Sequence, residues 1–115
     1  MKSSTWPDFV RSLPEADLPF DGLRGWLLEG EFGQVLFMET DVEVIVTQHS
    51  HGDQWGIVVE GKIDLAIGDK THTYTSGESY FIPSGTPHQA RIHPGFRAID
   101  YLVDRDRYHT RSRSR

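Results

Sequence analysis

The chain has 115 residues and a mass of 13.1 kDa, with 37% hydrophobic and 25% charged residues. These values are typical of one globular domain, and a chain of this length can bury roughly 60 to 70% of the surface that it exposes when unfolded. It contains no cysteine, which excludes disulfides, thiolate metal sites and cysteine nucleophiles and favours a cytoplasmic location. The longest apolar run, residues 35–38, is far shorter than the ~18 residues of a membrane span, so we expect no membrane helix and no secretory signal.

Charge is distributed unevenly along the chain. Residues 1–103 contain 15 acidic and seven basic residues, a net charge of −8, whereas the last twelve residues carry +3. An acidic body argues against nucleic acid as a main partner, because phosphate binding requires a positive face. We expect residues 105–115 to form a basic, disordered tail, and the alternative is that its alternating Arg and Ser residues contact RNA or an acidic surface.

The N-terminal segment, residues 1–23, differs from the rest of the chain. Residues 5–13 predict a short helix with Pro7 in its first turn, and two further prolines keep the following stretch irregular. Several of its side chains are too apolar for a free tail. We expect them to pack on the outside of the main domain or on a neighbouring subunit; they are Trp6, Phe9, Leu13, Leu18 and Phe20.

From residue 24 the sequence is typical of short antiparallel strands separated by turns. Gly68-Asp69 is a favoured two-residue hairpin turn between alternating segments. The pattern predicts an all-β jelly-roll barrel over residues 24–104. The expected strands are 24–29, 34–39, 42–48, 54–60, 62–67, 70–75, 79–82, 88–93 and 96–103.

Three of the six histidines stand in positions where they could meet. His49 and His51 lie two residues apart at the end of a predicted strand, so both side chains project to one face. Gln54 follows, and its side-chain carbonyl can also bind a metal. His88 comes after a Pro- and Gly-rich corner, residues 83–87. Taken singly, each histidine is also consistent with an ordinary polar loop; together the residues predict a metal site.

The second of these segments resembles a motif of the cupin family, G(X)5PXG(X)2H(X)3N. Residues 77–88 satisfy every spacing from the first glycine to His88, although Ile92 stands in the place of the asparagine. Only 15 residues, 62–76, separate the two motifs, as in small single-domain, RmlC-like cupins. The resemblance covers about residues 35–103 and implies a jelly-roll β-barrel.

The first segment resembles the other cupin motif, G(X)5HXH(X)3-4E(X)6G, less closely. His49 and His51 form the HXH pair, and Gln54 stands in the place of the glutamate when counted back from Gly61. The loop after His51 is one residue short, and Glu43 replaces the opening glycine. By resemblance, the histidines bind a divalent transition metal (Fe, Mn, Ni or Zn), with Gln54 either a direct ligand or a hydrogen-bond donor one shell further out.

Replacing a carboxylate by an amide leaves the metal with one negative charge less, which favours an anionic chelating ligand. Tyr80 and Tyr101 are candidate proton donors if they point toward the metal. The lumen of the barrel is expected to be lined by aromatic and aliphatic side chains, with Ile45, Phe37, Trp55, Tyr80, Phe81 and Tyr101 as candidates. The remaining histidines, His72, His93 and His109, are not expected at the site.

Strict alternation would place His49 and His51 on the strand face opposite Val42, Val44 and Val46. Either a β-bulge near residue 48 changes the phase, or the valine face is covered by a second sheet. Small cupins resembling this chain often dimerise in this way, so we expect a homodimer.

Two functions remain open from the sequence. The first is a metalloenzyme acting on a small oxygen-rich metabolite, by dioxygenase, isomerase, lyase or cyclase chemistry. The second is a non-catalytic cupin that binds a sugar, a metabolite or a metal. One barrel fold supports many unrelated reactions, so the substrate cannot be read from the fold.

Overall fold

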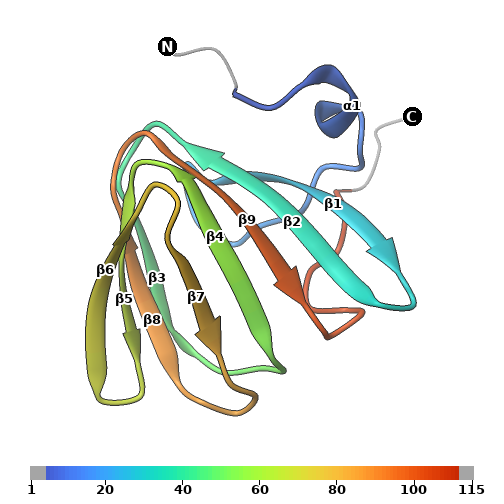
Figure 1. Cartoon of the computed structure of the whole chain (residues 1–115). Helices are drawn as coiled ribbons and strands as arrows, with labels where there is room; N and C mark the ends of the chain where they lie inside the picture. Colours follow the sequence, from blue (N-terminus) through green and yellow to red (C-terminus); the bar gives the residue numbers. More distant parts are fainter. Residues whose placement is uncertain (1–4, 112–115) are drawn as a thin grey trace.

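The computed structural model describes residues 5–111 as two antiparallel β-sheets packed face to face (Figure 1). The five-stranded sheet has the order β1-β2-β9-β4-β7 and the four-stranded sheet the order β3-β8-β5-β6. The predicted all-β jelly roll is confirmed. Its strands are β1 (Arg24–Gly30), β2 (Gly33–Thr40), β3 (Val44–His49), β4 (Gln54–Glu60), β5 (Lys62–Ile67), β6 (Lys70–Thr75), β7 (Ser79–Ile82), β8 (His88–Ile92) and β9 (Phe96–Leu102).

The main core lies between the two sheets. Alternate side chains of each strand point inward, so that Leu36 and Val58 of the larger sheet pack toward Ile63 and Ile92 of the smaller one. Phe96 is fully buried among them. Complete burial of such a side chain stabilises the fold by about 1.5–3 kcal/mol.

An irregularity in β3 determines which side chains of this strand enter the barrel. Val46 pairs with Ala90 and His49 pairs with His88, so two residues of β3, Thr47 and Gln48, lie opposite one residue of β8. This β-bulge shifts the alternation by one residue. Val44, Val46 and the His49 side chain can therefore all face the interior. Of the two explanations that the sequence left open, the bulge is the one observed: Val44 is buried and Val46 half-buried, and of the three valines only Val42 is exposed.

The N-terminal segment packs on both sides of the larger sheet. The helix α1 (Asp8–Arg11) places Val10 beside Trp6, and both contact Trp26 in a small cluster outside the barrel. Further along, Leu18 and Leu23 join the main core instead. No helix in residues 5–111 is long and apolar enough to cross a membrane.

The C-terminal residues 105–111 differ from the predicted disordered tail. They run back along the barrel, where Thr110 pairs with Ala16. The buried side chain of Gln34 holds Tyr108 by two hydrogen bonds, one from Nε2 to its carbonyl (2.8 Å) and one from its N–H to Oε1 (3.0 Å). The reason is the Tyr108 side chain, which packs against the core. Residues 112–115 of the predicted tail, like residues 1–4, lie outside the described part.

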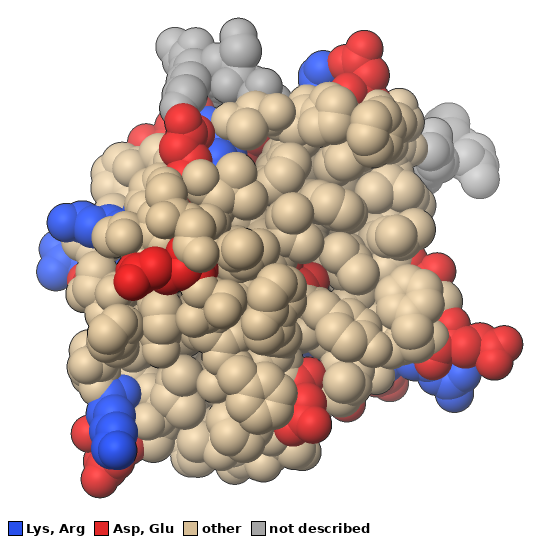
Figure 2. All heavy atoms as spheres, in the orientation of Figure 1, with Lys and Arg blue, Asp and Glu red and all other residues tan. Residues whose placement is uncertain are grey.

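The outer face of the five-stranded sheet carries an apolar row. The strand register aligns five side chains across all of its strands, and they are Leu28, Val35, Tyr101, Trp55 and Phe81. Phe81 is 53% exposed and Trp55 42%. Lys and Arg side chains lie around the edge of the view in Figure 2, and none lies over the middle of β9 and β4. The five residues of the row are uncharged and the N-terminal segment leaves Trp55 and Phe81 exposed, although some acidic side chains also appear within this view (Figure 2).

We expect deletion of Gln48 to turn His49 outward, because Val44 and Val46 are held inside by the apolar surface they bury. The measurement is the affinity for Zn²⁺ by competition with a chelator, and the deletion should abolish tight binding. Gln48→Ala, which keeps the bulge, is the control and should bind as the wild type does. A deletion variant with unchanged affinity would contradict the assigned role of the bulge.

Candidate metal centre

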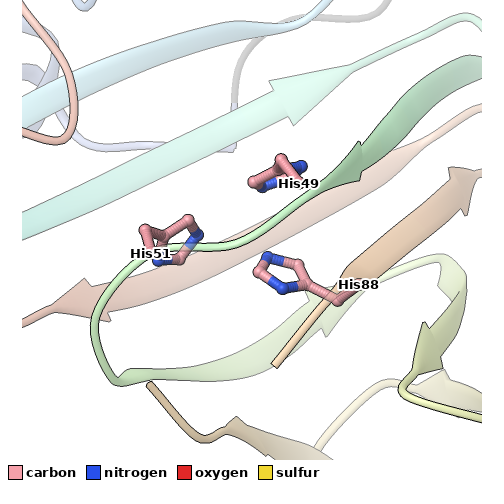
Figure 3. Close-up of side chains that lie close together, drawn as sticks. All are labelled: His49, His51 and His88. Atoms are coloured by element: carbon pink, nitrogen blue, oxygen red, sulfur yellow. The ribbon is translucent and has the colours of Figure 1, made fainter. Parts of the chain in front are cut away.

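The structure brings His49, His51 and His88 together inside one end of the barrel (Figure 3). His49 ends β3 and lies directly opposite His88 at the start of β8, and their ring centroids are 4.2 Å apart. The centroid of His51, in the loop after β3, lies 5.2 Å from that of His49 and 4.8 Å from that of His88. One nitrogen of each ring lies within 4.8 Å of the other two, so the three residues could hold a metal ion.

Backbone carbonyls determine the tautomer of all three rings. Nδ1 of His49 lies 2.8 Å from the Thr47 carbonyl oxygen, and Nδ1 of His51 and His88 lie 2.9 Å from the carbonyls of Gly52 and Thr86. A carbonyl oxygen only accepts, so each Nδ1 carries the proton and donates it. In the neutral rings every Nε2 is then left with a free lone pair, the form that binds metal.

The surroundings of these lone pairs fit a cation. Nε2 of His51 and Nε2 of His88 are buried and have no hydrogen-bond partner within residues 5–111. A buried polar atom without a partner costs about 1–3 kcal/mol. Nitrogen ligands of this kind suit a divalent transition metal, which would satisfy both atoms at once. The residues present therefore fit the metal that the resemblance implies.

Burial keeps these histidines uncharged. The pKa of His88 is lowered from 6.5 to about 4, chiefly by desolvation and also by the neighbouring His49, His51 and Arg107, against the hydrogen bond to Thr86. Desolvation likewise lowers the pKa of His51. Both rings are neutral at physiological pH, so a metal ion does not have to displace a proton from them.

Hydrogen bonds connect the loop that carries His51 to the corner that precedes His88. The carbonyl of His51 accepts from Gly85 N–H (2.8 Å), and the carboxylate of Asp53 accepts from Ser84 N–H (2.7 Å). Asp104 accepts from Gly52 N–H (2.8 Å). One backbone–backbone hydrogen bond and one from a backbone N–H to the Asp53 side chain thus hold the two histidine segments together, which limits relative movement of the rings.

Gln54 belongs to a buried polar group beside the histidines. Its Nε2 donates to Oδ2 of Asp100 (2.7 Å), and the hydroxyl of Tyr80 donates to Oδ1 of the same carboxylate (2.6 Å). Gly56 lies between Tyr80 and Asp100 in the sheet. A Cβ at position 56 would approach Asp100 Oδ1 to 2.1 Å, so only glycine leaves room for this contact.

Burial disfavours the charged form of the acids in this group as it does for the histidines, so here it raises the pKa instead of lowering it. The pKa of Asp100 is raised from 3.8 to about 6, because desolvation outweighs the hydrogen bonds from Tyr80 and Gln54 that lower it. Desolvation and the adjacent carboxylate raise the pKa of Tyr80. Asp100 is therefore the acidic group at the site whose pKa lies nearest neutrality.

A cavity of about 50 Å³ joins the histidines to this polar group. Its polar lining is His49, Gln54, Tyr80, His88 and Asp100, and the rest is mostly aliphatic and aromatic, including Tyr108 of the C-terminal segment. Arg107, which precedes Tyr108, supplies a positive charge near the histidines. The guanidinium of Arg107 lies 4.4 Å from the Tyr108 ring centroid, and its Nε is buried without a hydrogen-bond partner in the described structure.

The other residues singled out in the sequence lie elsewhere. Tyr101 projects from the outer face of β9, where its hydroxyl donates to the Phe32 carbonyl (2.6 Å), so it is not brought to the histidines. Of the expected lumen residues, only Tyr80 lines the cavity. Ile45, Trp55 and Phe81 are exposed, while Phe37 packs beneath the N-terminal segment. His93 pairs with Asp64 (2.8 Å), and His72 and His109 are exposed.

Sequence reasoning missed Asp100 and Arg107. Asp100 is the only charged residue between Ala98 and Leu102, and a carboxylate inside an apolar strand is a signal of a buried polar site. Arg107 lay in the segment expected to be a free tail, so nothing in the sequence placed it near the histidines.

The family description "Cupin domain" matches residues 33–99, more than half of the chain. The chain belongs to the cupin family. Its fold is similar to that of KdgF from Halomonas sp. (TM-score 0.72, 21% identity, covering 91% of this chain and 97% of that one). It is also similar to an RmlC-like cupin from Shewanella frigidimarina (TM-score 0.74, 23% identity, covering 90% and 95%).

A further similar structure is that of oxalate decarboxylase from Bacillus subtilis, with a TM-score of 0.69 and 18% identity. The match covers 80% of this cupin and 27% of the decarboxylase chain. At these identities the solved structures establish a shared fold. No curated protein matches the sequence.

The pKa of His88 predicts how the metal-free cupin responds to acid. The unfolded chain takes up the His88 proton near pH 6.5, and the folded chain only near pH 4, so stability should fall as the pH drops through this interval. The His88 contribution is about 3 kcal/mol, and it should be absent from His88→Asn. Urea unfolding of both proteins from pH 7 to 4 measures it.

Asp100 changes the stability in the opposite direction. Its pKa is raised in the folded state, so the folded protein takes up the Asp100 proton more readily and gains stability as the pH falls from about 6 to 3.8. Taking the difference between the wild type and His88→Asn removes this contribution, which both proteins share. Parallel pH profiles would refute the assigned pKa of His88.

Proposed function

We propose that this cupin is a metalloenzyme that acts on a small, oxygen-rich organic anion. The observation that carries the proposal is the set of three Nε2 lone pairs, two of them buried without partners, that the backbone directs into one end of the barrel. His49, His51 and His88 would hold a divalent transition metal, Fe, Mn, Ni or Zn, and Gln54 would be its fourth protein ligand. The metal, when bound, supplies a Lewis acid that polarises an oxygen of the ligand.

The charges around the cluster support an anionic ligand. The three histidines and Gln54 contribute no negative charge, so a bound divalent ion keeps its charge of about +2 at the ligand shell. Arg107 adds a second positive charge, which contributes, after desolvation, to the lowered pKa of His51 and His88, while Asp104 acts in the opposite direction on His51. Two cationic centres in a partly buried site are costly unless an anion lies between them. A carboxylate or enolate that chelates the metal and contacts Arg107 satisfies both.

Tyr80 remains the proposed proton-transfer residue, together with Asp100. The hydroxyl of Tyr80 and the carboxylate of Asp100 share a hydrogen bond of 2.6 Å at the wall of the cavity. Burial raises the pKa of Asp100 to about 6, which suits an acid or base working near neutral pH. This pair would hold a proton next to the metal-bound ligand. The structural neighbour named oxalate decarboxylase acts on a small carboxylate, which is consistent with this ligand class.

We expect His51→Ala and His88→Ala to lose the metal that the wild type retains when purified from its native host, because each removes one of three nitrogen ligands. Metal analysis of the purified proteins measures this. His93→Ala, which removes a histidine outside the cluster, is the matched control and should retain the metal. Full metal retention in both site variants would end the proposal.

The same proteins separate an enzyme from a non-catalytic binding module. Metal-loaded wild type should consume a member of a panel of hydroxy acids, keto acids and dicarboxylates, and Arg107→Ala should raise KM about tenfold or more, as expected on loss of a charged hydrogen bond. Tight binding of a panel member without turnover would favour the binding module instead.

We propose further that a second copy of the chain covers the outer face of the five-stranded sheet. The N-terminal segment covers one row of this face, around Trp26, and ends beside the exposed row that contains Trp55 and Phe81. Stable interfaces have an apolar, aromatic centre, and this face exposes Trp55 and Phe81, with Lys and Arg side chains mostly around the edge of the view (Figure 2). A row that crosses the sheet can contact itself across a twofold axis, which fits a homodimer. This face replaces the valine face that the sequence favoured for dimerisation.

The variant Trp55→Glu/Phe81→Glu should be monomeric, because it would bury two unpaired carboxylates in the interface. Light scattering of the wild type at micromolar concentration should give about twice the chain mass of 13.1 kDa. Ile45→Glu is the control, since Ile45 is 57% exposed on the other sheet and its replacement should leave the dimer intact. A monomeric wild type would contradict the proposed homodimer.

A further inference from the structure

Gln54 has one feature that distinguishes it from a free amide at the cavity wall. Its Nε2 is used by Asp100, whose two oxygens each accept one hydrogen bond, one from Gln54 (2.7 Å) and one from Tyr80 (2.6 Å). A carboxylate that accepts on both oxygens is in its acceptor-only form. Only the N–H₂ end of the amide can face it, so the orientation of Gln54 is determined by Asp100.

The other end of the amide is then available to the site. Oε1 and Nε2 diverge from the same planar carbon, so an amide whose Nε2 is held by Asp100 presents Oε1 in a different direction. Gln54 lines the same cavity as His49 and His88. An amide oxygen is a metal ligand, whereas the N–H₂ group is not.

We propose that Asp100 is a positioning residue that turns the carbonyl oxygen of Gln54 toward the three histidines. In this arrangement Gln54 and Asp100 together replace a single carboxylate ligand. The ligand position is neutral, and the negative charge stands one hydrogen bond further from the ion. The inference rests on the proposed metal site and adds a second, buried residue to it.

The residues around Asp100 accommodate its buried negative charge. Asp100 is 4% exposed and lies in β9 between Ile99 and Tyr101, which project to the opposite face. Gly56 leaves the space beside it, because any side chain at position 56 would collide with both Asp100 and Tyr80. A buried carboxylate is costly unless it is hydrogen-bonded. Here Gln54 and Tyr80 donate the hydrogen bonds, and Gly56, which has no side chain, leaves the space.

The test exchanges the amide of residue 54 and the carboxylate of residue 100. It measures the affinity for Zn²⁺ and for Ni²⁺ alone, by competition with a chelator. Asp100→Asn removes the charge and should weaken binding about 10- to 100-fold, as loss of a partner behind a metal ligand does. Gln54→Glu/Asp100→Asn restores a carboxylate–amide pair with donor and acceptor reversed. It should bind at least as tightly as the wild type, because the carboxylate now stands at the ligand position.

Two controls separate this inference from the metal site itself. Tyr80→Phe removes the other hydrogen bond to Asp100 and leaves Gln54 held, so its metal affinity should stay within about threefold of the wild type. His88→Ala should abolish binding. If His88→Ala binds normally, the proposed metal site fails; if it does not bind but Asp100→Asn binds as the wild type does, the positioning role alone fails.

Thermal unfolding of the metal-free proteins provides a second readout. Gln54→Glu places two carboxylates at hydrogen-bond distance and should lower the melting temperature, and adding Asp100→Asn should restore it. If Asp100→Asn alone does not fold, the double variant decides the question. A folded, metal-binding double variant supports the exchange, and an unfolded one overturns it.

Discussion

The candidate site depends on the hydrogen bonds between three histidine Nδ1 atoms and backbone carbonyls of their own loops. These bonds leave the Nε2 lone pairs unprotonated and aim them into the barrel. Without them each imidazole could present either nitrogen, and the cluster would have no defined ligand atoms. Two of the Nε2 atoms remain buried and unpartnered within residues 5–111, so local hydrogen bonds stabilise an arrangement that is unfavourable until something electrophilic binds.

The balance of charge in the interior follows from the replacement of a carboxylate by Gln54. A glutamate at this position would bring a negative charge directly to the ion, but it could not also lie beside Asp100 without sharing a proton. The amide avoids this conflict, because it donates to Asp100 and, in the proposed site, would offer its oxygen to the metal. Gly56 completes the arrangement by leaving space for the carboxylate. The fold thus retains a buried acid, Asp100, while the residue proposed as the fourth ligand is neutral.

The sequence is sufficient to predict the strands and the grouping of the three histidines. It is not sufficient to predict which side chains of β3, β4 and β7 face the interior, and the reason is physical. Strand positions follow from alternation and turn residues, which are local signals. A bulge is different, because the extra residue at 47–48 changes which face every preceding side chain occupies, and both phases were consistent with the sequence. Trp55 and Phe81 were expected inside because they are large and apolar, but their strand phase places them outside. Hydrophobicity alone does not distinguish a core from an interface.

The size of the cavity limits how a ligand can be held. A water molecule needs roughly 10–15 Å³ of such space, so about 50 Å³ accommodates only a few atoms beyond the histidines. The proposed organic anion, if it has more atoms than this, would extend past the cavity, which Tyr108, next to Arg107, helps to line. That segment is held by Gln34 at Tyr108 and by Asp104 at Gly52, next to His51. Recognition of the proposed ligand beyond its chelating end would therefore depend on the C-terminal segment, which could give a barrel with a common fold its own specificity.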